Sequence, residues 1–371
     1  MSFQHHWIED LLEKMERKFR VEAERLGTRI PYISIQGRYD DMGEKNIAWW
    51  TNSFWAGILW QLRHATQDGM YEAAATASEE RLEEMFAYPD TWDHDIGFLG
   101  LLTSVARYRA TGDRTAQERG LRDADILMSR FCENGRYIKA WNPPAPSCMI
   151  IDCLMNLPLL FWATNITGRP EYREVAEAHL ETASRYLLRD DGSCNHIAEF
   201  DGDGRLVNLP GGQGYGPGSS WSRGQAWSLY GFALAYRHTG NPEHLSRSKL
   251  AAHYFISAVR ATGYVSRIDF RAPDQPIYID TTATACAASG LLELAGHVPE
   301  FEKHLYRDAA YEMLQALAQD FLDLDPSTDG ILQKGSARYN RESDREVHII
   351  YGDYFLLEAV LRFLGQDAFL W

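Results

Sequence analysis

The sequence lacks the features that mark membrane-spanning and disulfide-bonded secreted proteins. Its 371 residues contain no apolar run of about 18 residues that would span a bilayer. The amino end, MSFQHHWIEDLLEKMERKF, is charged and amphipathic rather than signal-like. The five cysteines are scattered without C-x-x-C spacing, a pattern typical of reduced thiols in or near a core. We therefore expect a cytoplasmic protein.

Positive charge is also scarce. The chain has 37 Lys and Arg against 52 Asp and Glu, which gives a net charge of −15. A surface this acidic repels nucleic acids and anionic membranes, so we expect neither as a partner. No Pro- or Ser-rich linker interrupts the sequence, and we expect a single domain over residues 1–371, as a monomer or homodimer.

Tryptophan, in contrast, is abundant, with eleven residues. Indole rings fill hydrophobic cores, and their faces also stack on sugar rings. Composition alone leaves both roles open.

Glycine occurs at the ends of a series of apolar helical stretches. Glycine just past a last helical turn takes the left-handed conformation without a steric clash, so each position predicts a helix end. Between them the apolar spacing is helical, and strand-like alternation is confined to short pieces such as 136–141 and 196–200. Six helical hairpins predict an all-α (α/α)6 barrel with an inner and an outer ring of helices. The six glycines are Gly69, Gly112, Gly168, Gly240, Gly296 and Gly365.

Polar residues recur 16 or 17 residues before five of these glycines. If the marked helices form the inner ring, their first residues lie at one mouth of the barrel, where free N–H groups favour an anionic ligand. Capping of helix starts is an alternative role, above all for Asn52 and Asp280. The sixth unit departs from this spacing, with His348 and Asp353 as its polar residues. The five residues are Asn52, Asp95, Asp152, Arg223 and Asp280.

Two of these carboxylates suit acid–base chemistry. Asp152 lies within the apolar string SCMIIDCLMNLPLLFW, which predicts a buried carboxyl group at a cavity wall. Burial and a second carboxylate both raise a carboxyl pKa, and Asp95, beside Trp92 and His94, is the candidate second group. We expect Asp152 to be a general acid with a raised pKa.

A cluster of Trp221, Arg223 and Trp227 surrounds another helix start. Residues 223 and 227 are one helical turn apart and share a face. An arginine between indoles suits a carboxylate carried on a flat ring. Core packing with an ion pair is the alternative.

The sequence contains no complete metal-binding or cofactor-binding motif. The DGDG at 201–204 starts like a calcium loop, but Gly212 stands where a bidentate Glu is needed. His94 and Asp95 have no second His one helical turn away. We expect no metal and no cofactor.

Five segments in order along the chain resemble glycoside hydrolase family 88, the unsaturated glucuronyl hydrolases. The strings IIDCLMNLPLL and SSWSRGQAW are the most specific. The segments are WTNSFWAGILW (50–60), WDHDIGFLG (92–100), IIDCLMNLPLL (150–160), SSWSRGQAWSLYGF (219–232) and IYGDYFLLEA (350–359).

That resemblance implies an (α/α)6 barrel that removes a 4,5-unsaturated uronic acid from the non-reducing end of oligosaccharides made by polysaccharide lyases. It implies hydration of the vinyl ether, with Asp152 as both acid and base and Asp95 holding substrate hydroxyls. Further residues then contact the substrate: Trp50, His94, His196, Gln213, Trp221, Arg223 and Trp227.

Two departures from the family pattern affect the expected substrate. Gly212-Gln213 stands where a His-Gln pair is expected. The Ser-x-x-Ser-x-Lys string of members that act on sulfated fragments is absent from QKGSARYNRESDREVHIIYGDYF, which argues against such substrates, although Arg338, Arg341 and Arg345 offer other anion contacts.

Three alternatives share parts of this pattern. Family 105, the unsaturated rhamnogalacturonyl hydrolases, has the same barrel and similar chemistry, but the MNLPLL string argues against it. Sugar 2-epimerases on this barrel work through paired histidines, whereas the polar ring here is rich in carboxylates. A non-catalytic helical scaffold leaves the Trp-Arg-Trp cluster unexplained.

Overall fold

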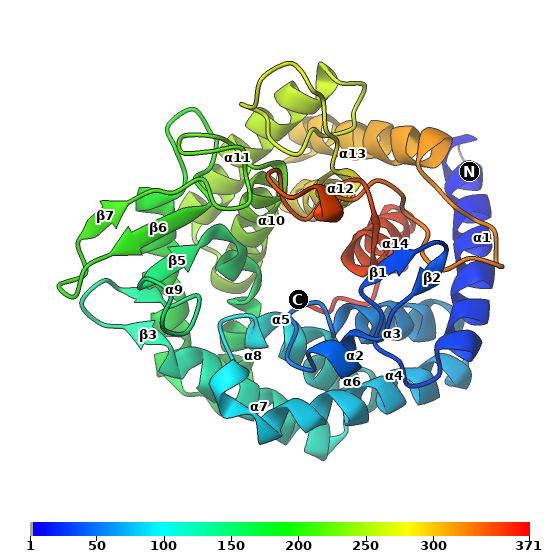
Figure 1. The fold of residues 1–371 in the computed structure, drawn as a ribbon, viewed down its shortest axis with the longest axis horizontal. Coiled ribbons are helices and arrows are strands. Elements are labelled where there is room, and N and C mark those ends of the chain that lie inside the picture. Colours follow the sequence, from blue (N-terminus) through cyan, green and yellow to red (C-terminus); the bar gives the residue numbers. More distant parts are fainter. Residues whose placement is uncertain (1–2) are drawn as a thin grey trace.

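The structure, a computed structural model, describes residues 3–371, with side chains from residue 6 onward. Two concentric rings of helices form an (α/α)6 barrel, as Figure 1 shows in a view down its shortest axis. The prediction of an all-α barrel of this type is confirmed. The outer helices are α1 (Phe3–Leu26), α4 (Gly69–Leu82), α7 (Arg114–Ser129), α9 (Pro170–Tyr186), α11 (Pro242–Arg260) and α13 (Glu300–Asp320).

The inner helices carry most of the buried side chains. Every residue of α10 from Ser222 to Ala235 is buried, whereas the outer helices bury one face only. The second inner segment is continuous through a π-helical turn at Leu101–Val105. The inner elements are α3 (Phe54–Thr66), α5 (Ile96–Gly100) with α6 (Ala106–Thr111), α8 (Pro158–Thr167), α10 (Ser222–Thr239), α12 (Thr281–Ala295) and α14 (Ile350–Leu364).

The glycine rule for helix ends holds at Gly112, Gly168, Gly240 and Gly365, which cap inner helices in the left-handed conformation. Gly296 follows α12 but has a φ of −69°, so it needs no glycine-specific conformation.

The prediction that Gly69 ends a helix is wrong. Gln67 takes the left-handed cap of α3 with a φ of 60°, and Gly69 begins the next helix, α4. The physical reason is the side chain of Asp68, which accepts a hydrogen bond from Met70 N and caps α4.

Short strands and loops cover the end at which the inner helices begin, called the mouth below. The strands β5 (Cys148–Ile150), β6 (Ile197–Phe200) and β7 (Leu206–Asn208) form one small sheet. A second sheet joins β1 (Ile33–Ile35), β2 (Arg38–Tyr39) and β8 (His348–Ile349), and β3 (Phe131–Cys132) pairs with β4 (Tyr137–Ile138). A short helix, α2 (Met42–Lys45), precedes α3.

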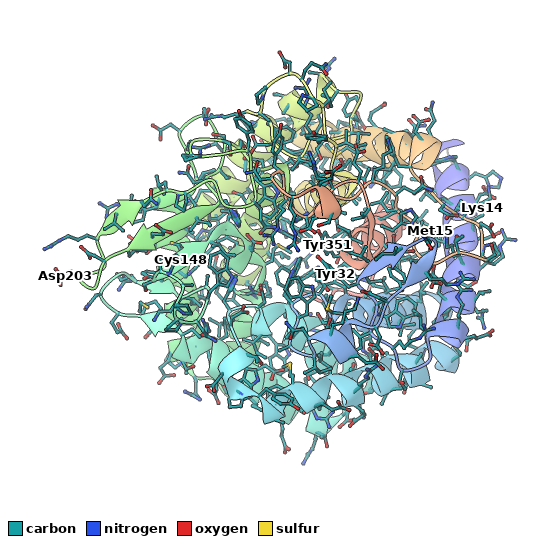
Figure 2. All side chains as sticks on the ribbon, in the orientation of Figure 1. Lys14, Met15, Tyr32, Cys148, Asp203 and Tyr351 are labelled. Carbon is teal, nitrogen blue, oxygen red and sulfur yellow. The ribbon has the colours of Figure 1, made fainter. Side chains whose placement is uncertain are left out.

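Side chains of the mouth differ in their distance from the barrel axis. In Figure 2, Tyr351 and Tyr32 lie near the centre of the ring, whereas Asp203 lies at the outer tip of the β6–β7 hairpin. The two strand-like pieces predicted from the sequence fall on β4 and β6. The end opposite the mouth, where the inner helices finish, is called the far end.

Candidate active site

The small sheet at the mouth places Asp152 beside His196. The antiparallel register of β5 and β6 pairs Ile150 with Ile197, and Ile151 N donates to His196 O at 3.0 Å. Asp152 follows in a 3-10 helix, η4 (Ile151–Met155). Its Oδ2 therefore lies 3.4 Å from His196 Nε2.

Asp152 is buried, with 12% of its side chain exposed. Burial is the largest influence and would raise its pKa, but the neighbouring His196 outweighs it, with His94 and Arg223 adding to the effect. The pKa of Asp152 is therefore lowered. The expectation of a raised pKa for this residue is wrong, because the sequence pattern did not show how many cationic or cationisable groups surround the carboxyl.

Asp95 has the raised pKa instead. It stands before α5 without capping the helix, and 14% of its side chain is exposed. Burial, and then the charge of Asp152, raise the pKa of Asp95 to about 7. The site thus combines two carboxyl groups whose pKa values are driven apart, an arrangement typical of acid–base catalysis.

Two histidines accompany the two carboxyl groups. His94 is buried, and its Nε2 lies 3.5 Å from Asp95 Oδ1. On the other side, the His196 ring lies 4.5 Å from the Trp221 ring. Gln213, from the loop before α10, donates its backbone N–H to His196 Nδ1 at 2.9 Å.

Arg223 is buried near these carboxyl groups and histidines, and its charge is paired within the protein. Its guanidinium donates to Asp280 Oδ2 at 3.2 Å and to the backbone oxygens of Ser336 and Ala337. Asp280 also caps α12 by accepting from Thr282 N, so the capping role weighed for Asp280 is confirmed. Of the three guanidinium nitrogens of Arg223, Nε has no hydrogen-bond partner among the described residues.

The rings around Arg223 differ in part from the expected pair of indoles. Its guanidinium carbon lies 4.5 Å from the Trp221 ring and 5.0 Å from the Tyr351 ring. Trp227 packs instead against Phe98, because residue 227 lies one turn deeper along α10. Tyr351 is a site residue that the sequence analysis missed, although it stands in the IYGDYF segment.

Trp50 lies in the turn before α3, partly exposed, with its ring 5.1 Å from that of Tyr351. The Nε1 atoms of Trp221 and Trp227 have no hydrogen-bond partner among the described residues. A buried polar atom without a partner is costly, and several such atoms near one mouth indicate a binding site for a polar ligand.

Two residues of the predicted polar ring serve the fold. Asn52 does not cap α3, and its amide donates to the backbone oxygens of Asn46 and Ile47. Asp353 lies inside α14, where it accepts from Tyr39 Oη and from backbone N–H groups. Asp353 lies one turn past the start of α14, which places its carboxylate against these donors rather than at the mouth.

Within the described residues, no group of three or more His, Cys, Asp or Glu could hold a metal ion. Nor is any helix in that part of the chain long and apolar enough to cross a membrane.

Comparison with known proteins gives consistent results. The family model of Glycosyl Hydrolase Family 88 matches residues 24–341. The unsaturated glucuronyl hydrolase of Bacillus sp. (strain GL1) is 37% identical, over 91% of this chain and 92% of that protein. An unsaturated chondroitin disaccharide hydrolase of Streptococcus pneumoniae is 33% identical, over 87% and 83%. The crystal structure of the Bacillus sp. GL1 enzyme superposes with a TM-score of 0.91 at 35% identity, covering 98% of this chain and 99% of that one.

Proposed function

The chain belongs to glycoside hydrolase family 88, and from this we propose that it removes a 4,5-unsaturated uronic acid from the non-reducing end of lyase-generated oligosaccharides. It is a hydrolase, and the relatives named above are an unsaturated glucuronyl hydrolase and an unsaturated chondroitin disaccharide hydrolase. The observation that carries the proposal is the pair of carboxyl groups at the mouth, Asp152 and Asp95, with oppositely shifted pKa values.

In the proposed reaction Asp152 donates a proton to C4 of the vinyl ether and then takes one from the water that adds to C5. The hemiketal at C5 opens to a ketone, the ring oxygen becomes the hydroxyl at C1, and the aglycone oxygen leaves with that proton as C1 becomes an aldehyde. One residue acts as acid and then as base, and Asp95 binds substrate hydroxyls beside it.

In the ligand-free protein Asp95 is the more readily protonated of the two carboxyl groups near neutral pH, since the pKa of Asp95 is about 7 while that of Asp152 is lowered. A bound uronate adds a negative charge and excludes water from the mouth. Both changes raise the pKa of Asp152, so substrate binding favours its protonated form. A coupled pair of this kind titrates as one unit.

The substitution Asp152→Asn tests this function. We expect a loss of activity of roughly 10²- to 10⁴-fold, the usual contribution of general acid–base catalysis, with the fold unchanged by circular dichroism. Activity is followed as the loss of ultraviolet absorbance of the conjugated double bond. An Asp152→Asn variant with full activity would refute the assignment.

We also propose a preference for unsulfated fragments. Arg338 and Arg341 both approach Asp344, at 3.3 and 3.6 Å, and Arg345 stacks over the Tyr278 ring at 3.9 Å. These three arginines are thus engaged within the protein. A panel of lyase-generated disaccharides, sulfated and unsulfated, tests this preference, and equal kcat/KM for matched pairs would contradict it.

We further propose a cytoplasmic, single-domain hydrolase that acts as a monomer or homodimer without a cofactor. Its anionic substrate is compatible with a net charge of −15, because a short fragment presents few charges, unlike a polyanion.

A further inference from the structure

Asn156 joins the two halves of the candidate site. It lies between η4 and α8, four residues after Asp152, and it is fully buried. Its Oδ1 accepts a hydrogen bond from Phe98 N at 2.7 Å. Because this contact fixes the oxygen, the Nδ2 group must point the other way, toward His94 and Asp95.

The amide nitrogen of Asn156 meets both of these side chains. It lies 3.2 Å from His94 Nδ1 and 3.3 Å from Asp95 Oδ1. An amide NH2 group only donates, so His94 Nδ1 accepts and carries no proton. Burial lowers the pKa of His94, and its ring is therefore neutral with its single proton on Nε2.

The second imidazole has the same arrangement with a different donor. His196 Nδ1 accepts from the backbone N–H of Gln213 at 2.9 Å, so a neutral His196 also carries its proton on Nε2. That atom lies 3.4 Å from Asp152 Oδ2, as His94 Nε2 lies 3.5 Å from Asp95 Oδ1. Neither Nε2 atom has a hydrogen-bond partner in the described structure, so each imidazole N–H lies near a carboxyl group without bonding to it.

We propose that Asn156 is a positioning residue that fixes His94 in the Nε2–H tautomer and so leaves that N–H, which has no partner in the described structure, for the substrate hydroxyls. The orientation is a property of the free protein. Its kinetic consequence rests on the function proposed above.

The packing around Asn156 supports a fixed position. A Cβ atom at Gly97 would lie 2.4 Å from Asn156 Cβ, far inside van der Waals contact. Glycine at position 97 therefore allows α5 to approach Asn156 closely enough for Phe98 N to hold the amide oxygen.

The tautomer is measured by ¹⁵N NMR of histidine-labelled protein, with the His94 signals assigned from a His94→Gln spectrum. Asn156→Asp keeps the shape of the side chain but replaces the donor with an acceptor. We expect His94 Nδ1 to become protonated in this variant, while His196 keeps its Nε2–H signature because a backbone group holds its Nδ1. An unchanged His94 signature in Asn156→Asp would overturn the proposal.

Asn156→Ala is the second variant, since it removes the donor without adding a charge. We expect a mixture of His94 tautomers and a loss of kcat/KM of roughly 3- to 10-fold, the worth of a hydrogen bond between neutral groups. Gln61→Glu is the matched control at the far end, where the buried Gln61 amide bonds to the backbone N–H and oxygen of Ala368. It should reduce stability and leave the His94 signature and kcat/KM unchanged.

The two readouts separate the two proposals. A wild-type protein that does not hydrolyse unsaturated disaccharides refutes the function, yet its NMR spectrum still decides the tautomer. A changed tautomer with unchanged kcat/KM refutes the positioning role.

Discussion

Both ends of the inner helices bury polar side chains, but the hydrogen-bond partners of these side chains differ between the two ends. At the far end, both oxygens of Glu293 and of Glu358 accept hydrogen bonds from neighbouring side chains. At the mouth, the Nε1 atoms of Trp221 and Trp227 and the Nε of Arg223 have no such partner in the described structure. The carboxylate oxygens at the far end are paired within the protein, although Arg362 Nε and Nη2 and His238 Nε2 also lack a partner in the described structure, whereas the indole N–H groups at the mouth are unpaired.

The pKa shifts have opposite signs at the two ends. Burial would raise the pKa of Glu293, but Arg362, His297 and Arg237 lower it well below its ordinary value. Asp95 has no such cation in contact, and its pKa rises to about 7. A buried carboxylate therefore stabilises the fold at one end and costs stability at the other.

The largest stability effect is expected from Glu293→Gln. The substitution leaves Arg362, which is 6% exposed, without its closest carboxylate, and breaking a buried ion pair costs about 3–5 kcal/mol. Denaturant unfolding measures this loss, and kcat/KM should not change. Glu300→Gln, at an exposed pair with Lys303, is the control and should unfold like the wild type.

The pH dependence sharpens this prediction. Because the folded-state pKa of Glu293 is lowered, its stabilisation is present above its unfolded pKa and is lost as the pH falls through the folded value. Glu293→Gln should therefore flatten the loss of stability in acid. An equally steep acid limb in the variant would contradict the assigned ion pair.

Asp95→Asn should have the opposite effect at the mouth. The pKa of Asp95 is raised from 3.8 to about 7, so its stabilising contribution is present below pH 4 and is lost as the pH rises through 7. Since one pKa unit corresponds to about 1.4 kcal/mol, the variant should be more stable at neutral pH by about 2–4 kcal/mol. Activity should fall severely.

The charge of Asp152 provides a control for this effect. It contributes to the raised pKa of Asp95, so Asp95→Asn should gain less stability in an Asp152→Asn background. Equal gains in both backgrounds, measured by denaturant unfolding at neutral pH, would show that the two carboxyl groups do not interact.

The sequence predicted those parts of the fold that depend on local chemistry. Gly112 and Gly240 were correctly identified as helix caps, since a left-handed residue after an apolar helix is a local requirement. Gln67 was missed because a non-glycine residue takes the same conformation there. The π-helical turn at Leu101–Val105 has no signal in the apolar spacing.

The candidate site shows the same division. The spacing of polar residues within the helical repeat predicted Asp95 and Asp152 as site residues, because all inner helices begin at the same mouth. The pairing of Arg223 with Asp280 joins two different hairpins, and the contacts of Asn156 depend on a close approach at Gly97. Such tertiary contacts decide pKa values and tautomers, and one sequence without its packing does not show them.

The smallest effects compare two buried indoles that both pack against Phe98 and Phe355, Trp371 at the C-terminus and Trp227 on α10. Trp371 Nε1 donates to Glu358 Oε1 at 2.6 Å, and its ring stacks on Phe355, whereas Trp227 Nε1 has no partner among the described residues. Trp371→Phe should keep the stacking but lose the hydrogen bond, so unfolding should require about 1–2 kcal/mol less, with unchanged kinetics.

Trp227→Phe removes an N–H that has no hydrogen-bond partner in the described structure, so no hydrogen bond is lost. Replacing either buried indole by a phenyl ring leaves a cavity, and Trp227→Phe should therefore lose less stability than Trp371→Phe by about 1 kcal/mol. If that N–H is left for substrate, KM should rise by about fivefold to tenfold, the worth of one hydrogen bond of about 1 kcal/mol. Denaturant unfolding and initial rates on both variants measure this. The comparison between the two indoles would fail if Trp227→Phe lost as much stability as Trp371→Phe and kept its KM, because Trp227 would then be a core residue like Trp371.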